Sequence, residues 1–269
     1  MSELKPGLPE RLERVRGELA AAERAAGRPA GSVRLIAVGK TFPVEACEEA
    51  YACGQRAFGE NYVQEGVEKI VHFRAVHPED PGEWHFIGPL QANKTRLVAE
   101  HFDWVQSVDR LRIASRLSAQ RPAGMPPLNI LIEVNIDGEE TKSGVAPSEV
   151  EAFADEIAGY PGLRLRGLMA IPAPAADSES RRRPLAAMRA LFERLRVKHP
   201  GMDTLSMGMS ADMDEAVSEG ATMVRVGRAV FGPRDYMRAR LLALRLENPI
   251  MMPRRPARAH FGGGFSIWW

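Results

Sequence analysis

The sequence has few of the residues that would mark a secreted, membrane-bound or nucleic-acid-binding protein. Its 269 residues include two cysteines, Cys47 and Cys53, six apart on a predicted helix, so we expect reduced structural thiols without a local disulfide. The first twenty-five residues carry five glutamates and no apolar core, unlike a signal peptide. No apolar run approaches a membrane span, and 36 basic against 35 acidic residues leave no charge footprint for nucleic acid or a membrane surface. We expect a cytoplasmic protein.

Two absent motifs narrow the fold and the chemistry. No Gly-x-Gly-x-x-Gly turn follows a predicted strand, which argues against a dinucleotide-binding fold. No spacing of histidines and carboxylates resembles a metal site. The length suits a single α/β barrel, which commonly needs about 250 residues, and 45% hydrophobic residues can fill a sizeable core.

Strands alternate with helical patterns along most of the chain. An amphipathic helix comes first, with Leu8, Leu12, Val15 and Leu19 at helical spacing. Eight strands are predicted, each followed by a helical pattern: Val33–Val38, Arg56–Phe58, Trp84–Ile87, Trp104–Val108, Leu128–Val134, Leu163–Ile171, Thr204–Met207 and Met223–Val226. Eight βα units favour an α/β fold closed into a (β/α)8 TIM barrel with an extra N-terminal helix; the alternative is an open doubly wound sheet. We assign the barrel to residues 1–246 and a tail to residues 247–269.

A lysine at the end of the first strand is the leading candidate for chemistry. Alternation of side chains puts Lys40 on the same face as Ile36 and Val38, which would pack the barrel interior. An amine partly removed from water at the mouth of a barrel can react as the neutral form with an aldehyde. The alternative is a solvated loop lysine.

The ends of the last two strands suggest a phosphate site. Ser210 is expected to cap a helix that opens with acidic residues, and Gly227 permits close backbone approach to a ligand. Barrels commonly place a phosphate site after strands seven and eight, although Ser210 alone could be a cap and nothing more. An amine beside a phosphate site indicates a phosphorylated aldehyde, for which the biological candidate is pyridoxal 5'-phosphate (PLP).

Three further residues are candidates for contact with this cofactor. Arg225 shares the face of Gly227, and beside the pyridine nitrogen it would leave that nitrogen unprotonated, because arginine does not readily give up a proton. The alternative is a buried structural ion pair. His85 is a candidate acid or base at the mouth, or else a hydrogen-bonded core residue. Asn61 could bond a ring hydroxyl or orient a water, or serve ordinary turn chemistry.

These residues resemble the pyridoxal phosphate homeostasis protein family, also called the proline synthetase co-transcribed homologues. The segments that carry the resemblance lie between about residues 8 and 236: Ala37–Thr41, Phe58–Glu65, Trp84–Lys94, Lys142–Gly144, Arg166–Pro172, Leu205–Ser210 and Arg225–Gly232. The resemblance implies a barrel like the N-terminal domain of alanine racemase, with PLP as a Schiff base on Lys40. It places the phosphate at Ser210 and the backbone of Gly227 and Arg228, and sets Arg225 against the ring nitrogen.

The resemblance also implies a function. Members are thought to bind, buffer or deliver PLP and to influence amino-acid and keto-acid balance, with no established catalytic activity. The partners it implies are PLP and PLP-dependent apoenzymes, and we expect a monomer or a weak dimer. Three positions depart from the family, which often has serine at Gly39, an acidic residue at Ala211 and threonine at Arg228. Arg228 removes a hydroxyl ligand, while its backbone N–H can still serve and its side chain adds charge.

Two other functions stay open. One is a PLP-dependent amino-acid racemase, which needs an acid or base on each face of the substrate; in the racemase fold a tyrosine of a separate β domain is the second base. The tyrosines here are Tyr51, Tyr62, Tyr160 and Tyr236, none in an additional β-rich module, although Tyr62 lies near a strand end. The other is an interaction module that uses the tail, whose terminal tryptophans could dock on a partner or the barrel, or be disordered.

Overall fold

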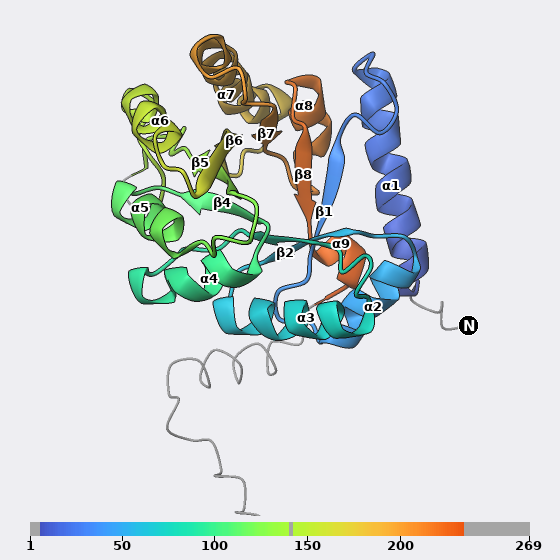
Figure 1. Ribbon diagram of the computed structural model, residues 1–269. Helices are drawn as coiled ribbons and strands as arrows, with labels where there is room; N and C mark the ends of the chain where they lie inside the picture. Colours follow the sequence, from blue (N-terminus) through green and yellow to red (C-terminus); the bar gives the residue numbers. More distant parts are fainter. Residues whose placement is uncertain (1–5, 140–141, 234–269) are drawn as a thin grey trace, which may run out of the picture. The chain divides into compact units, whose positions relative to one another are not determined.

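The computed structural model describes residues 6–139 and 142–233, which form a closed barrel of eight parallel strands in sequence order (Figure 1). The strands are β1 (Arg34–Val38), β2 (Ala57–Glu60), β3 (Glu83–Phe86), β4 (Trp104–Val108), β5 (Leu128–Glu133), β6 (Leu163–Met169), β7 (Thr204–Ser206) and β8 (Met223–Val226). Pairing of β1 with β8 closes the barrel. The predicted TIM barrel is confirmed, and the open sheet is excluded.

Helices surround the strands (Figure 1). They are α1 (Leu8–Ala25), α2 (Val44–Ala52), α3 (Val63–Val76), the 3-10 helix η1 (Ala92–Lys94), α4 (Thr95–His101), α5 (Leu111–Gln120), α6 (Val150–Ala158), α7 (Ser178–Lys198), α8 (Met213–Ser218) and α9 (Arg228–Phe231). Helix α1 is the predicted extra helix. It buries its leucine stripe, and Arg11 Nε donates to the carbonyl of Val230 at 2.9 Å, so the first helix is tied to the last described one.

Two of the predicted element limits were wrong in ways that affect the site. Strand β2 runs to Glu60 instead of ending at Phe58, because Gly59 and Glu60 pair with β3 and Gly59 also pairs with β1. Glycine and glutamate have low strand propensity, so the pattern hid this extension. Helix α8 begins at Met213 with Asp212 at its N-cap, so Ser210 is not the predicted cap.

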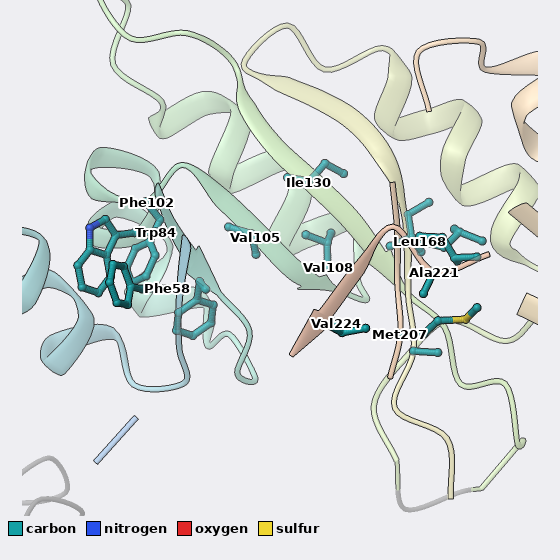
Figure 2. Close-up of a cluster of buried hydrophobic side chains, with 14 of the residues drawn as sticks. Phe58, Trp84, Phe102, Val105, Val108, Ile130, Leu168, Met207, Ala221 and Val224 are labelled. Carbon is teal, nitrogen blue, oxygen red and sulfur yellow. The ribbon is translucent and has the colours of Figure 1, made fainter. Parts of the chain in front are cut away.

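The core has two layers because side chains alternate across each strand. One layer fills the barrel and consists of Ile36, Ala57, Trp104, Leu131, Met169 and Met223. The other lies between strands and helices, and Figure 2 shows part of it. There Phe58 stacks on Trp84 with ring centroids 5.0 Å apart, near Phe102. The side chains that point into the barrel therefore include some at the carboxyl ends of the strands. At these ends barrels place their functional loops.

No helix in residues 6–139 and 142–233 is long and apolar enough to cross a membrane. The predicted boundary at residue 246 and the tail 247–269 lie outside the described residues.

A tight backbone crossing fixes the register of β6. The pairing of β5 with β6 shifts between Ile130 and Leu131, opposite Leu165 and Gly167. Gly167 has φ +152°, and a Cβ there would lie 1.7 Å from the carbonyl oxygen of Thr204 on β7. Only glycine fits this bulge, where two neighbouring strands are held at once.

We predict that Gly167→Ala lowers the free energy of unfolding by at least about 3 kcal/mol, because the methyl group would force β6 and β7 apart. Urea denaturation measures this, with Gly201→Ala as the control. Nothing lies within 4 Å of a Cβ at Gly201. Equal stability of the two variants would show that the bulge yields without cost.

Candidate functional site

Three of the predicted site residues, Lys40, Ser210 and Gly227, lie in loops that follow neighbouring strands. Ala37 of β1 pairs with Val226 of β8, and the N–H of Arg225 donates to the carbonyl of Gly208, just after β7, at 3.0 Å. The carboxyl ends of β7, β8 and β1 are therefore adjacent (Figure 1). This topology puts the segments with Lys40, Ser210 and Gly227 at one end of the barrel.

Lys40 lies in a strained turn directly after β1. The N–H of Phe42 donates to the carbonyl of Gly39 at 3.0 Å, which closes a four-residue turn around Lys40 and Thr41. Thr41 has φ +69°, a conformation unusual for a β-branched residue. Its N–H donates to Glu65 Oε1 at 2.7 Å, so a side chain of α3 holds the strained residue in place. Such strain persists only where the surroundings impose it, and it is common at ligand sites.

A buried cluster of charged side chains is bonded to the backbone of this turn. Lys69 Nζ, 4% exposed, donates to Glu60 Oε1 and Glu65 Oε1 at 2.7 Å each and to the carbonyl of Gly39 at 2.9 Å. Glu65 thus contacts both Lys69 and the N–H of Thr41. We call Glu60, Glu65 and Lys69 the lysine cluster. It fixes the backbone on both sides of Lys40.

Two carboxyl groups share one cation in the lysine cluster. Burial raises the pKa of Glu60 to about 7, the charge of Glu65 adds to this, and the charges of Lys69 and Lys40 oppose it. Burial alone would lower the pKa of Lys69, but the neighbouring carboxylates raise it overall. Lys69 is therefore a permanent buried cation, and its charge opposes the protonation of Glu60.

At the end of the barrel where a phosphate is expected, backbone N–H groups are better candidates for binding it than the predicted side chain of Ser210. Ser210 lies exposed in a turn, and Asp212 Oδ1 accepts a hydrogen bond from the N–H of Met209 at 2.7 Å. Gly227 is the N-cap of α9, and a Cβ there would meet the carbonyl oxygen of Val38 at 3.4 Å. The first N–H groups of α9, beginning with that of Arg228, have no acceptor within the helix.

Arg225 is buried inside the barrel. Its Nη1 donates to Ser206 Oγ at 2.7 Å and its Nη2 to the carbonyl of Ala170 at 2.9 Å. Burial lowers its pKa to about 10, so the guanidinium stays charged at neutral pH. Among the residues that the structure describes, no carboxylate forms an ion pair with Arg225, so the alternative of a buried structural ion pair was wrong.

Asn61 and His85 occupy different surroundings. Asn61 follows β2, and its buried Oδ1, like the buried Oγ1 of Thr41, has no hydrogen-bond partner among the described residues. His85 is fully buried inside the barrel, where Nε2 contacts Glu83 Oε1 at 2.6 Å and Nδ1 contacts Gln106 Nε2 at 2.9 Å. Both ring nitrogens are bonded, so the structure favours the alternative of a hydrogen-bonded core residue over an acid or base at the mouth.

Comparison with known proteins identifies the relatives of this chain. The family described as alanine racemase, N-terminal domain, matches residues 11–235. The pyridoxal phosphate homeostasis protein of Vibrio cholerae is 53% identical over 227 residues, which cover 84% of this chain and 96% of the relative. The Escherichia coli K12 protein of the same name is 53% identical over 225 residues, with the same coverage. The chain belongs to the pyridoxal phosphate homeostasis protein family.

Solved structures agree with this family. PipY of Synechococcus elongatus, solved with PLP bound, is 35% identical, has a TM-score of 0.73 and covers 84% of this chain and 100% of its own. Alanine racemase from Corynebacterium glutamicum is 16% identical with a TM-score of 0.60, over 83% of this chain and 62% of that one. The second likeness shows the shared barrel alone.

The structure explains one departure from the family. At Gly39, where the family often has serine, a Cβ would lie 2.9 Å from both Cys47 Sγ and Glu60 Oε1. The buried Cys47 thiol, whose pKa burial raises to about 12, fills the space that a serine side chain would need. Glycine at this position lets the lysine cluster contact the turn directly.

A small cavity lies at the end of β5. It has a volume of about 170 Å³, and its lining includes Glu133, Asn135, Lys142 and Ile171. Burial raises the pKa of Glu133 to about 7, helped by Asp109 and opposed by Arg225. Asn135 bonds the backbone of Glu139 in both directions, so it serves turn chemistry.

Sequence reasoning missed the lysine cluster and Glu133. Glu65 and Lys69 are four apart on α3, a spacing typical of surface helix pairs, so nothing distinguished them from solvated charges. Glu133 directly follows the apolar run Ile130–Ile132 of β5, much as Lys40 comes just after β1, and that position was a usable signal.

We predict that Lys69→Met destabilises the fold by about 3–5 kcal/mol, since it leaves two buried carboxyl groups without a cation. Lys198→Met is the matched control, because Lys198 pairs with Asp155 at 2.5 Å on the surface, where solvent screens the charge. Urea denaturation of both variants checks this. Equal, small losses of stability would show that the lysine cluster does not hold the turn.

We predict that stability falls between about pH 4.5 and pH 7 through Glu133. Within that window the folded state keeps a proton on Glu133 that the unfolded state has lost, because its pKa rises from 4.5 to about 7. Relative to Glu133→Gln, the free energy of unfolding of the wild type should fall by at most about 3 kcal/mol on raising the pH. Parallel stability curves for the two proteins would contradict the raised pKa.

Proposed function

We propose that this protein binds PLP at Lys40 and serves its homeostasis by holding, buffering and delivering the cofactor. The observation that carries this proposal is the placement of a lysine, a buried guanidinium and free first-turn N–H groups on the adjacent strands β1 and β8. Family membership and the PLP-bound structure of the relative PipY support the choice of ligand.

The residues present fit the cofactor. Thr41 Oγ1 and Asn61 Oδ1 are buried and have no hydrogen-bond partner in the part of the chain that the structure describes, so a polar ligand or its bound water would satisfy them. The backbone of Gly227 and Arg228 offers N–H groups for the phosphate, with Ser210 and the exposed Arg228 guanidinium beside them. When bound, PLP supplies an aldehyde that a lysine amine converts to an imine with loss of water.

Each remaining residue orients the cofactor in this proposal. Arg225 faces the ring nitrogen as a donor that keeps its own proton, because its pKa stays near 10. Asn61 bonds the ring hydroxyl directly or through a water. His85 acts through its neighbours and does not touch the cofactor.

We further propose that the protein is a carrier that acts without turnover, in the cytoplasm, as a monomer or weak dimer that passes PLP to apoenzymes. Both cysteines are free thiols, which suits a reducing compartment. The described tyrosines Tyr51 and Tyr160 bond Asp80 and Glu156 away from the mouth. A weak racemase is the second candidate, because Tyr62, 40% exposed, directly follows Asn61.

We predict that Lys40→Ala abolishes the visible absorbance band of the lysine-linked cofactor, whereas Lys94→Ala retains it, since Lys94 lies in η1. The measurement is an absorbance spectrum of each purified protein after incubation with PLP and gel filtration. Equal bands in both variants would move the attachment away from Lys40, and no band in the wild type would reject PLP binding.

The same preparations separate carrier from enzyme. Wild-type protein loaded with PLP should not turn over any member of a panel of amino acids. The same loaded protein should activate a PLP-dependent apoenzyme that is added to it. Sustained turnover of one amino acid, lost in Tyr62→Phe, would establish the racemase alternative.

A further inference from the structure

A chain of hydrogen bonds crosses the barrel interior from Arg225 to the opposite end. Arg225 Nη1 donates to Ser206 Oγ at 2.7 Å, and Ser206 Oγ donates to Gln106 Oε1 at 2.6 Å. Gln106 Nε2 contacts His85 Nδ1 at 2.9 Å, and His85 Nε2 contacts Glu83 Oε1 at 2.6 Å. We call Ser206, Gln106, His85 and Glu83 the interior chain.

With the Gln106 amide oriented as the structure has it, donor and acceptor chemistry sets the direction of every bond in the interior chain. Arginine has donors alone, so Ser206 Oγ accepts from it and directs its own proton to the Gln106 carbonyl oxygen. The amide NH₂ then faces His85, whose Nδ1 must accept, which leaves the proton on Nε2 for the Glu83 carboxylate. Burial lowers the pKa of His85, so the ring is neutral. Burial acts to raise the pKa of Glu83, but the hydrogen bond from His85 and the charge of Arg34 hold this pKa below its usual range.

The interior chain joins the cofactor end of the barrel to its other end. Ser206, Gln106 and His85 are 0% exposed and come from β7, β4 and β3. Glu83 is the first residue of β3 and pairs with Arg34, the first residue of β1, at 2.7 Å. One end is therefore the cation Arg225 and the other a partly exposed carboxylate, and aligned hydrogen bonds between opposite charges strengthen one another.

Packing alone does not require these residues. Six apolar side chains fill the rest of the barrel, and burying polar groups costs free energy unless every one is satisfied. Here each link is satisfied at both ends, and with the bond from Nη2 to Ala170 the guanidinium plane of Arg225 is fixed.

We propose that the interior chain is a positioning device, in which Ser206, Gln106, His85 and Glu83 hold and polarise the Arg225 guanidinium toward the ring nitrogen of bound PLP. The inference rests on the proposed binding of PLP at Lys40. It predicts that a substitution at Glu83, at the far end of the barrel, changes the absorbance and the affinity of the bound cofactor.

The first test uses protein without cofactor. Nitrogen-15 NMR of the imidazoles, with the His85 signals assigned by their absence in His85→Gln, should show a neutral ring protonated at Nε2. Gln106→Met should shift the Nδ1 resonance, whereas Gln55→Met should not. Gln55 is the matched control, because it is buried and its amide bonds the carbonyls of Leu35 and Ala57. A ring protonated at Nδ1 would overturn the interior chain whatever the protein binds.

The second test reads the bound cofactor. Ser206→Ala and Glu83→Gln should shift its absorbance maximum and weaken PLP binding about tenfold, the effect of losing one hydrogen bond to a charged group. Ser107→Ala is the control for Ser206→Ala, because Ser107 Oγ donates to the carbonyl of Gly88 at 2.6 Å and is not part of the interior chain. Asp203→Asn is the control for Glu83→Gln, because Asp203 precedes β7 and pairs with Arg166 at 2.6 Å.

The outcomes are distinct. Shifts in Ser206→Ala and Glu83→Gln, with neither control shifted, support the proposal. Wild-type binding with unchanged spectra in both variants overturns the interior chain and leaves the PLP site intact. Failure of the wild type to bind PLP overturns both, and Glu83→Gln, a substitution of a partly exposed residue, keeps the test valid if Ser206→Ala does not fold.

Discussion

The pairing of β1 with β8 is the contact on which the site depends. It closes the barrel, and its register sets Ile36 beside Arg225 and Ala37 beside Val226. Because side chains alternate across a strand, a slip of one residue would turn Arg225 out toward the helices. Backbone hydrogen bonds thus bring residues almost two hundred apart in the sequence to the same end of the barrel.

Two buried polar systems flank this contact, and they solve different problems. The lysine cluster lies under the turn after β1, where Lys69 binds the carbonyl of Gly39 and shares Glu65 with the N–H of Thr41. It fixes where the backbone of Lys40 is. The interior chain fixes how Arg225 is oriented on β8. Each is costly to bury. The interior chain is bonded at every link, and Lys69 is bonded to both carboxylates and to the turn, although Glu60 Oε2 and Glu65 Oε2 have no hydrogen-bond partner among the described residues. Bonded polar groups of this kind give a buried site its rigidity.

The sequence was sufficient for the barrel and for the order of its strands, although not for every strand end, since β2 extends to Glu60. Eight apolar runs separated by helical stripes predict a closed parallel sheet, and a lysine or glycine directly after such a run lies at its carboxyl edge. Local patterns could not predict contacts between distant side chains. For His85 the sequence left open a place at the mouth and a hydrogen-bonded place in the core, and only its partners Glu83 and Gln106 in the structure favour the core. Ser210 looked like a cap, but Asp212 occupies that position.

The arginine at the end of β8 also favours holding the cofactor over transforming a substrate. A PLP enzyme that stabilises a carbanion gains from a protonated ring nitrogen, since the ring is then a stronger electron sink. Arg225 can donate a hydrogen bond to that nitrogen, but with a pKa near 10 it does not hand over its proton at neutral pH. The interior chain draws the electron density of its acceptors toward the guanidinium and ends in a carboxylate, which makes the loss of that proton harder still. A ring kept as a weak electron sink limits side reactions of whatever amine enters the mouth, and a carrier needs that property if it is to release the cofactor unchanged.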